Sequence, residues 1–129
     1  MDEVRVGTPR GETPAEMKFS DISSYSPEEQ DALTYHRNNL LGGTHKRNHD
    51  GSLTTFYGAV VDTNEGSMII PRYWHGQIRS VPEAMELAMK SQYRFPRYPN
   101  TNAALAAEKK MHDQMSKDVD VFGSHRGGN

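Results

Sequence analysis

The sequence contains no cysteine among its 129 residues. Disulfide bonds and thiolate metal sites are therefore excluded. No run of 18 apolar residues occurs, so the sequence predicts no membrane-spanning helix. Mean hydropathy is -0.84, and apolar residues gather in a few periodic stretches. These features predict one small domain with a modest core and sizeable polar segments outside it.

The net charge is -2, but the acidic and basic residues are distributed unevenly along the chain. Residues 1–31 hold eight acidic and three basic side chains, whereas residues 32–129 hold nine acidic and twelve basic ones. Residues 1–25 also contain Pro9, Pro14 and scattered glycines, and they show no helical or strand period. We interpret residues 1–25 as an extended acidic arm, which either stays solvated or docks on a basic surface.

Two capping boxes predict where helices begin. Ser26, Pro27 and Glu29 combine a cap residue, a proline suited to the first helical position and a glutamate three residues after the cap. We expect a short helix of about two turns there, followed by a polar loop that continues to residue 49. Ser80 and Glu83 repeat the capping box and predict a second helix.

The longest helix is predicted over residues 101–117, after a break at Pro96 and Pro99. Apolar residues recur along it at helical spacing, namely Ala104, Ala107, Met111 and Met115. We expect this stripe to face the core, and we expect residues 119–129 to form a flexible tail.

Two stretches rich in β-branched and aromatic residues, 52–63 and 67–74, flank the short turn sequence NEG. They predict a β-hairpin. Because Pro71 has no N–H to donate, the second strand either lies at a sheet edge there or ends there. Residues 50–118 therefore predict a compact α+β domain, in which two helices cover the hairpin in the order ββαα, preceded by the short helix and the arm.

Short motifs recur in a particular order along this domain. They are Asp50-Gly51-Ser52 before a strand threonine, Ile69-Ile70-Pro71, Gly76, Glu83-Ala84, Ala107-Glu108 and Met111-His112. Their order over residues 38–115 resembles a small domain found in virion proteins of tailed bacteriophages. The chain departs from that pattern where Thr55-Phe56 and Arg72-Tyr73 replace a charged residue and a second apolar residue.

The resemblance implies a non-enzymatic structural or delivery role in a phage particle, and it implies no reaction. The expected partners are other virion proteins, present in many copies of a symmetric assembly. The expected location is the virion, reached after synthesis in the host cytoplasm. Plausible positions are the head–tail junction, the tail, the capsid surface and the set of internal proteins. Two alternatives stay open: an accessory module or small hydrolase for cell-wall degradation, and a small regulator that binds a host protein.

Signals for catalysis are weak. The sequence has no Gly-x-Ser-x-Gly elbow and no phosphate-binding glycine loop. Glu83 and Glu86 lie three residues apart and would suit paired carboxylates for glycosidic cleavage, but Glu83 already serves as a capping residue. His45 and His49 have metal-ligand spacing only within a helix, which Gly42-Gly43 opposes. We predict no catalytic residues, no metal and no cofactor.

Arginine and aromatic side chains interleave in two runs that one predicted helix separates. The candidates are Arg72, Tyr73, Trp74, Arg94, Phe95, Arg97 and Tyr98. Such residues suit protein-interface hot spots, and they also suit stacking on single-stranded nucleic acid. A pI of about 6.3 disfavours nucleic acid. We therefore predict a protein interface, with internal packing as the alternative, and leave open which way Trp74 faces.

Overall fold

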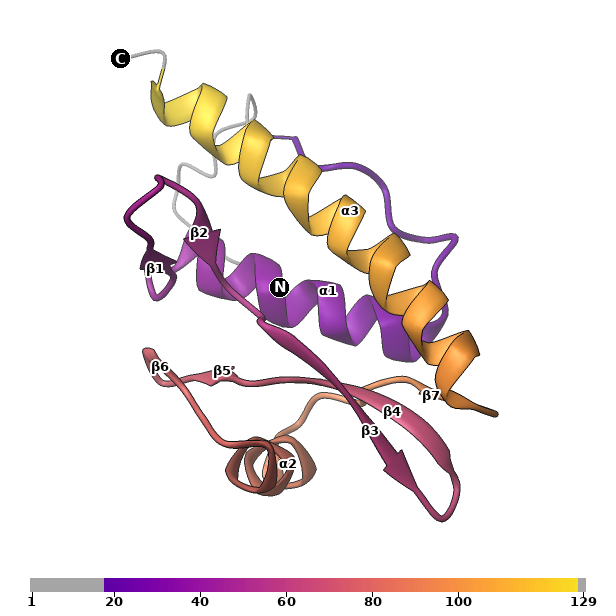
Figure 1. Ribbon diagram of the computed structural model, residues 1–129. Coiled ribbons are helices and arrows are strands. Elements are labelled where there is room, and N and C mark those ends of the chain that lie inside the picture. Colours follow the sequence, from indigo (N-terminus) through magenta and orange to yellow (C-terminus); the bar gives the residue numbers. More distant parts are fainter. Residues whose placement is uncertain (1–17, 128–129) are drawn as a thin grey trace.

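A computed structural model describes residues 18–127 and confirms the α+β class (Figure 1). Helix α1 (Pro27–Leu41) and helix α2 (Val81–Lys90) each begin with a complete capping box. In α1 the Glu29 N–H donates to Ser26 Oγ at 3.1 Å, and the Ser26 N–H donates to the Glu29 carboxylate at 3.0 Å. Ser80 and Glu83 make the same exchange in α2. Both predicted helix starts are confirmed.

Helix α1 has 15 residues, so the prediction of a short helix followed by a polar loop is wrong over residues 36–41. The helix continues because its inner face is buried, and tertiary packing stabilises a segment whose composition is polar. Gly42 ends the helix, and its N–H donates to the Asn38 carbonyl at 2.9 Å. The buried residues of α1 are Ala32, Leu33, Tyr35, His36 and Leu40. The core therefore begins before residue 50.

The predicted hairpin is strands β3 (Gly58–Thr63) and β4 (Gly66–Pro71), paired in antiparallel register. A third strand, β7 (Arg97–Tyr98), pairs with Ser67 and Met68 on the other side of β4. We expected no strand between Pro96 and Pro99, but Arg97 and Tyr98 keep their N–H groups. Strand β4 is thus central at its start and ends at Pro71. Only glycine fits at position 66, since a Cβ there would lie 2.3 Å from the Tyr98 carbonyl oxygen.

Each predicted strand is divided by a backbone bend. Tyr57, with φ of 52°, separates β2 (Leu53–Thr54) from β3, and β2 pairs with β1 (Lys46–Arg47). Beyond Pro71, strand β5 (Tyr73–Trp74) pairs with β6 (Gln77–Ile78). The Arg72 N–H donates to the Phe56 and Tyr57 carbonyls at 3.0 Å. These hydrogen bonds connect the bend at Tyr57 to the bend that follows Pro71.

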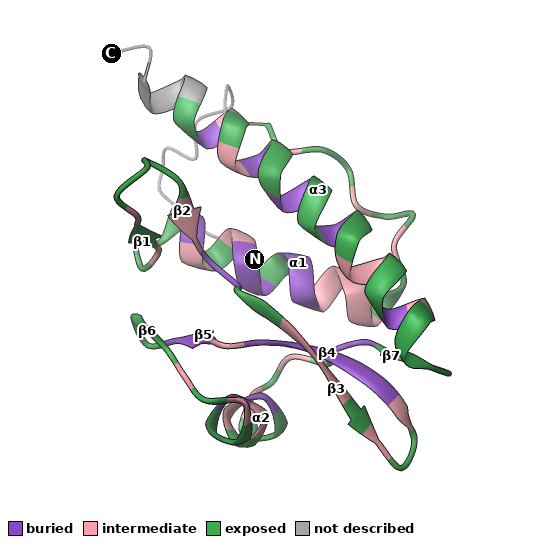
Figure 2. Cartoon of the chain, in the orientation of Figure 1, coloured by how far each residue is buried: buried purple, intermediate pink, exposed green. Residues whose placement is uncertain are grey.

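Helix α3 (Thr101–Gly127) runs beside α1 over strands β3 and β4, and α2 lies below them (Figure 1). The predicted stripe of α3 faces inward, with Ala104 and Met111 fully buried and Met115 nearly so (Figure 2). Tyr35 of α1 occupies the centre of an aromatic cluster. Its ring centroid lies 4.6 Å from Trp74, 5.2 Å from Tyr93, 6.0 Å from Phe95 and 6.1 Å from Phe56.

The predicted boundaries at both ends also change. Residues 119–127 continue α3, so the expected flexible tail is wrong there, and Phe122 is buried. Residues 1–17 and 128–129 lie outside the described residues. Residues 18–25 belong to the folded unit, because Ile22 and Tyr25 pack against the core and the Arg37 guanidinium lies 4.9 Å from the Phe19 ring. Within residues 18–127, no helix has the length and apolarity needed to cross a membrane.

Replacing Trp74 with alanine tests the aromatic cluster. We expect the free energy of unfolding to fall by about 3–5 kcal/mol, because the substitution empties a buried aromatic site. Leu105→Ala on exposed α3 surface is the control and should change it by less than about 0.5 kcal/mol. Urea denaturation followed by circular dichroism measures both. A loss below about 1 kcal/mol for Trp74→Ala would contradict the buried position of this side chain.

Candidate functional site

The arginine and aromatic candidates do not form one exposed surface. Tyr73, Trp74 and Phe95 are 2%, 6% and 4% exposed, and Trp74 Nε1 donates to the Pro71 carbonyl at 2.7 Å. The prediction of an interface is wrong for these three residues in the folded chain, because a small domain needs their area for its core. Trp74 faces inward.

The other four candidates bind within the chain. Arg72 Nε donates to the Arg79 carbonyl at 2.8 Å, and Arg97 pairs with Glu65 at 3.4 Å. Arg94 and Tyr98 instead reach α1: Arg94 donates to both Asp31 oxygens, and the Tyr98 hydroxyl donates to the Glu29 carboxylate. These contacts attach the segment before α3 to α1.

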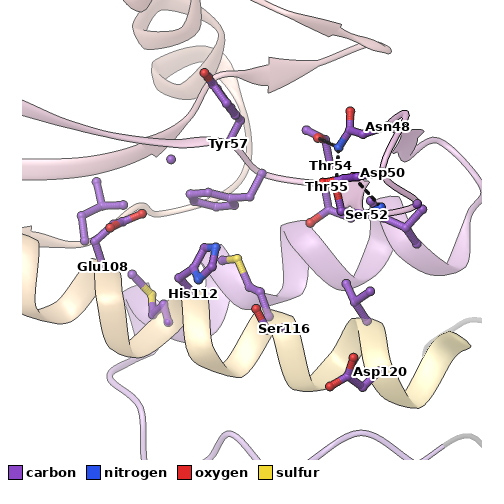
Figure 3. A pocket seen from close by; sticks show the side chains of 18 residues that line it. Asn48, Asp50, Ser52, Thr54, Thr55, Tyr57, Glu108, His112, Ser116 and Asp120 are labelled. Carbon is purple, nitrogen blue, oxygen red and sulfur yellow. Dashed lines mark hydrogen bonds between the residues drawn. The ribbon is translucent and has the colours of Figure 1, made fainter. Parts of the chain in front are cut away.

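A groove of about 800 Å3 opens between α3 and residues 48–58 (Figure 3). Its apolar floor consists of Phe56, Ile69, Met111 and Met115. These side chains also belong to the hydrophobic core. The groove therefore lies between two segments that both pack against the core, and its floor is formed by core residues.

The α3 wall consists of Glu108, His112, Ser116 and Asp120. These residues are spaced by four, so a helix places all of them on one face. Figure 3 shows Glu108 and His112 directed from α3 into the groove, with Tyr57 at the rim. Glu108 is half-buried and the other three are exposed.

The opposite wall is a polar turn that holds itself in place. The Ser52 N–H and hydroxyl donate to Asp50 Oδ1 at 2.9 and 2.6 Å, and Asn48 Nδ2 donates to the hydroxyls of Ser52 and Thr54. The hydrogen bonds from the Ser52 hydroxyl and N–H lower the pKa of Asp50. Asp50 is therefore a carboxylate at neutral pH, and the turn presents a fixed negative charge to the groove.

The corner where this wall meets the sheet has unusual backbone geometry. Tyr57 takes a positive φ, which non-glycine residues seldom adopt, and its side chain is 52% exposed. Gly58 follows at the first position of β3. A Cβ there would lie 3.2 Å from Glu108 Oε2 and 3.3 Å from the Phe56 ring, so glycine lets the Glu108 carboxylate lie close to the strand.

A buried polar network joins α1 to α3 and reaches the groove lining at Thr55. Asp118 is fully buried, and its carboxylate accepts hydrogen bonds from His36 Nε2 at 3.1 Å, from Arg37 at 2.7 and 3.0 Å, and from Gln114 Nε2 at 3.0 Å. Because the carboxylate can only accept, His36 carries its proton on Nε2. His36 Nδ1 therefore accepts from the hydroxyl of Thr55, which lines the groove.

Burial determines the ionisation of this network. Burial lowers the pKa of His36, so the ring is neutral at pH 7 even though its hydrogen bond with Asp118 acts in the opposite direction. Burial alone would raise the pKa of Asp118, but hydrogen bonds from His36 and Arg37 outweigh it and the pKa is lowered. The network thus contains an Arg37–Asp118 ion pair beside a neutral imidazole.

The order hydroxyl, imidazole, carboxylate is also the order of a hydrolytic triad. Here the Arg37 guanidinium pairs with both Asp118 oxygens, so its positive charge offsets the carboxylate and disfavours a second cation at His36. The arrangement therefore fits a structural link between α1, α3 and Thr55 better than an activated nucleophile.

The other sequence candidates lie apart from the groove. Glu83 closes the α2 cap, and Glu86 accepts from Lys90 at 2.9 Å, so each glutamate already has a partner. His45 stacks edge-on against Phe122 at 5.5 Å. Among the side chains that the structure describes, residues 18–123, no group of three or more histidine and acidic side chains is placed to hold a metal ion.

Sequence reasoning missed the groove because its walls are distant in sequence. Two signals were present in the chain: the polar stripe at every fourth residue of α3, and the motifs Asp50-Gly51-Ser52 and Met111-His112, which lie on facing walls. The partnership of His36 with Asp118 had no local signal. Comparisons of the chain with protein-family models, curated proteins and solved structures find no match.

The pH dependence of stability tests the buried network. In the unfolded chain His36 has the ordinary pKa of 6.5, whereas burial lowers it in the folded protein. Below pH 6.5 the unfolded chain therefore binds a proton that the folded protein resists, so the free energy of unfolding falls as the pH decreases. One such group contributes a slope of at most about 1.4 kcal/mol per pH unit.

Denaturation midpoints between pH 7.5 and 5 measure this slope. His36→Gln should flatten it, whatever the stability of the variant at pH 7.5. Ile70→Ala provides the control, because it loses buried area, keeps His36 and should retain the slope of the wild type. Equal slopes for His36→Gln and the wild type would show that His36 is not the titrating group.

Proposed function

We propose that the protein is a non-enzymatic structural component of a tailed bacteriophage particle. In this proposal its groove binds a segment of a neighbouring virion protein. The observation that supports it most strongly is the position of the motifs that resemble the virion domain. Asp50-Gly51-Ser52 and Thr55 line one wall, Ile69 contributes to the floor, and Glu108, Met111 and His112 belong to the floor and the facing wall. Four of the six motifs thus border one concave surface, whereas Gly76 and Glu83-Ala84 lie outside it.

The composition of the groove favours protein over nucleic acid as its occupant. An apolar floor with a polar rim is the usual anatomy of a protein-binding surface. Carboxylates of Asp50, Glu108 and Asp120 border the groove, and they would repel a phosphate backbone. The proposed partners are therefore other virion proteins, with several copies of this chain in a symmetric assembly of the virion.

Mass spectrometry of purified particles, combined with a groove-filling variant, tests this function. We expect the protein in the particle at a fixed copy number. Ser116→Trp places a large ring in the groove from an exposed helix position and should reduce incorporation about tenfold or more, given that a blocked site loses at least about 1.4 kcal/mol of binding.

Ala106→Trp is the matched control, because Ala106 is an exposed α3 residue outside the groove lining. It should be incorporated like the wild type. Absence of the wild-type protein from purified particles would end the structural proposal. Equal incorporation of both tryptophan variants would instead show that the groove is not the surface that binds the neighbouring virion protein.

A further inference from the structure

We propose that the occupant of the groove is an extended segment that carries apolar side chains flanked by lysine or arginine. This inference rests on the proposed function, because it names the chemistry of the partner at the same groove. The described residues that line the groove include three carboxylates, those of Asp50, Glu108 and Asp120, and they include neither lysine nor arginine.

Three cations near the groove have partners elsewhere in the chain. On α3, Lys109 pairs with Asp113 at 3.8 Å, and Lys110 lies 4.7 Å from the Tyr25 ring. Arg72 lies 5.5 Å from the Tyr57 ring while its Nε donates to the Arg79 carbonyl. Among the side chains of residues 18–123, neither Glu108 nor Asp120 has an ion-pair partner. Their charges remain available to a cationic partner.

The floor defines the apolar part of the occupant. Met115, which is 9% exposed, lines the groove with a flexible thioether side chain that adapts to apolar groups of different shape. Leu53 and Val119 are half-buried and extend the apolar lining. A volume of about 800 Å3 lies within the range of roughly 300–1,000 Å3 that binding pockets occupy, and it has room for more than one apolar side chain.

The sheet favours an extended backbone for the occupant. Strand β3 is an outer strand of its sheet, and its first residue, Gly58, lines the groove. Outer strands offer unpaired N–H and C=O groups, to which an extended segment can add. The exposed ring of Tyr57 stands at this corner and offers the kind of aromatic contact that dominates protein interfaces.

Charge also argues against the chain's own arm as the occupant. Residues 1–17 hold four acidic and two basic side chains, so they carry the same sign of charge as the groove. A partner segment with basic residues meets the groove with the opposite sign, which raises both specificity and the rate of encounter.

Two synthetic peptides test the inference directly: acetyl-Gly-Lys-Leu-Phe-Lys-Gly-amide, and its counterpart with glutamate in place of both lysines. Each is titrated into the full-length 15N-labelled protein to millimolar concentration, and amide chemical shifts are followed by NMR. We expect the lysine peptide to shift signals of residues 50–58 and 108–120 and to bind about tenfold or more tightly than the glutamate peptide.

Substitutions locate the charge effect. Glu108→Gln should weaken binding of the lysine peptide about two- to fivefold, as expected for one surface charge pair. Glu86→Gln removes an exposed α2 carboxylate that does not line the groove, and it should leave binding unchanged. Circular dichroism verifies that both variants are folded.

Equal binding of the two peptides, or no shift with either, would overturn the inference. The same is true if Glu108→Gln binds the lysine peptide as tightly as the wild type. These failures are separate from failure of the proposed function. A protein found in particles, with incorporation blocked by Ser116→Trp, keeps its structural role even if neither peptide binds. A protein absent from particles loses that role even if the lysine peptide binds as expected.

Discussion

The buried carboxylate of Asp118 joins helix α3 to helix α1, and the position of the groove depends on this link. His36 and Arg37 reach it from α1, while Gln114 holds it from one turn earlier in α3. Removing one partner from such a buried ion pair costs about 3–5 kcal/mol, because the remaining charge stays buried. The same His36 ring accepts from Thr55, so the link also determines how far the loop wall stands from α3.

A floor built from core residues and an exposed charged rim serve different purposes in this arrangement. Phe56, Met111 and Met115 belong to the core, so binding at the groove would require little ordering of the protein itself. That lowers the entropic cost of association and leaves the affinity to the rim and the partner. The rim residues Glu108, His112 and Asp120 follow one helix face, and their relative positions are therefore set by the geometry of α3.

Local signals in the sequence predicted the capping boxes at Ser26 and Ser80, the hairpin and the buried stripe of α3. Each of these depends on residues within a few positions of one another. The extension of α1, strand β7 and the continuation of α3 past residue 117 depend on partners that lie far away in the chain. Leu40 and Phe122 stabilise helix segments of polar composition only once the core exists. The aromatic runs were misinterpreted for the same reason, since composition does not say which way Trp74 faces.

Hydroxyl-radical footprinting of the free protein and of the assembled particle tests the central claim, that the groove is the surface covered in the virion. Tyr57 and His112 border the groove and are exposed in the free chain, whereas Met89, which is 57% exposed, lies on α2 away from it. We predict that Tyr57 and His112 lose most of their labelling in the particle and that Met89 keeps more of its own. Equal labelling of Tyr57 and His112 in the two states would contradict the account.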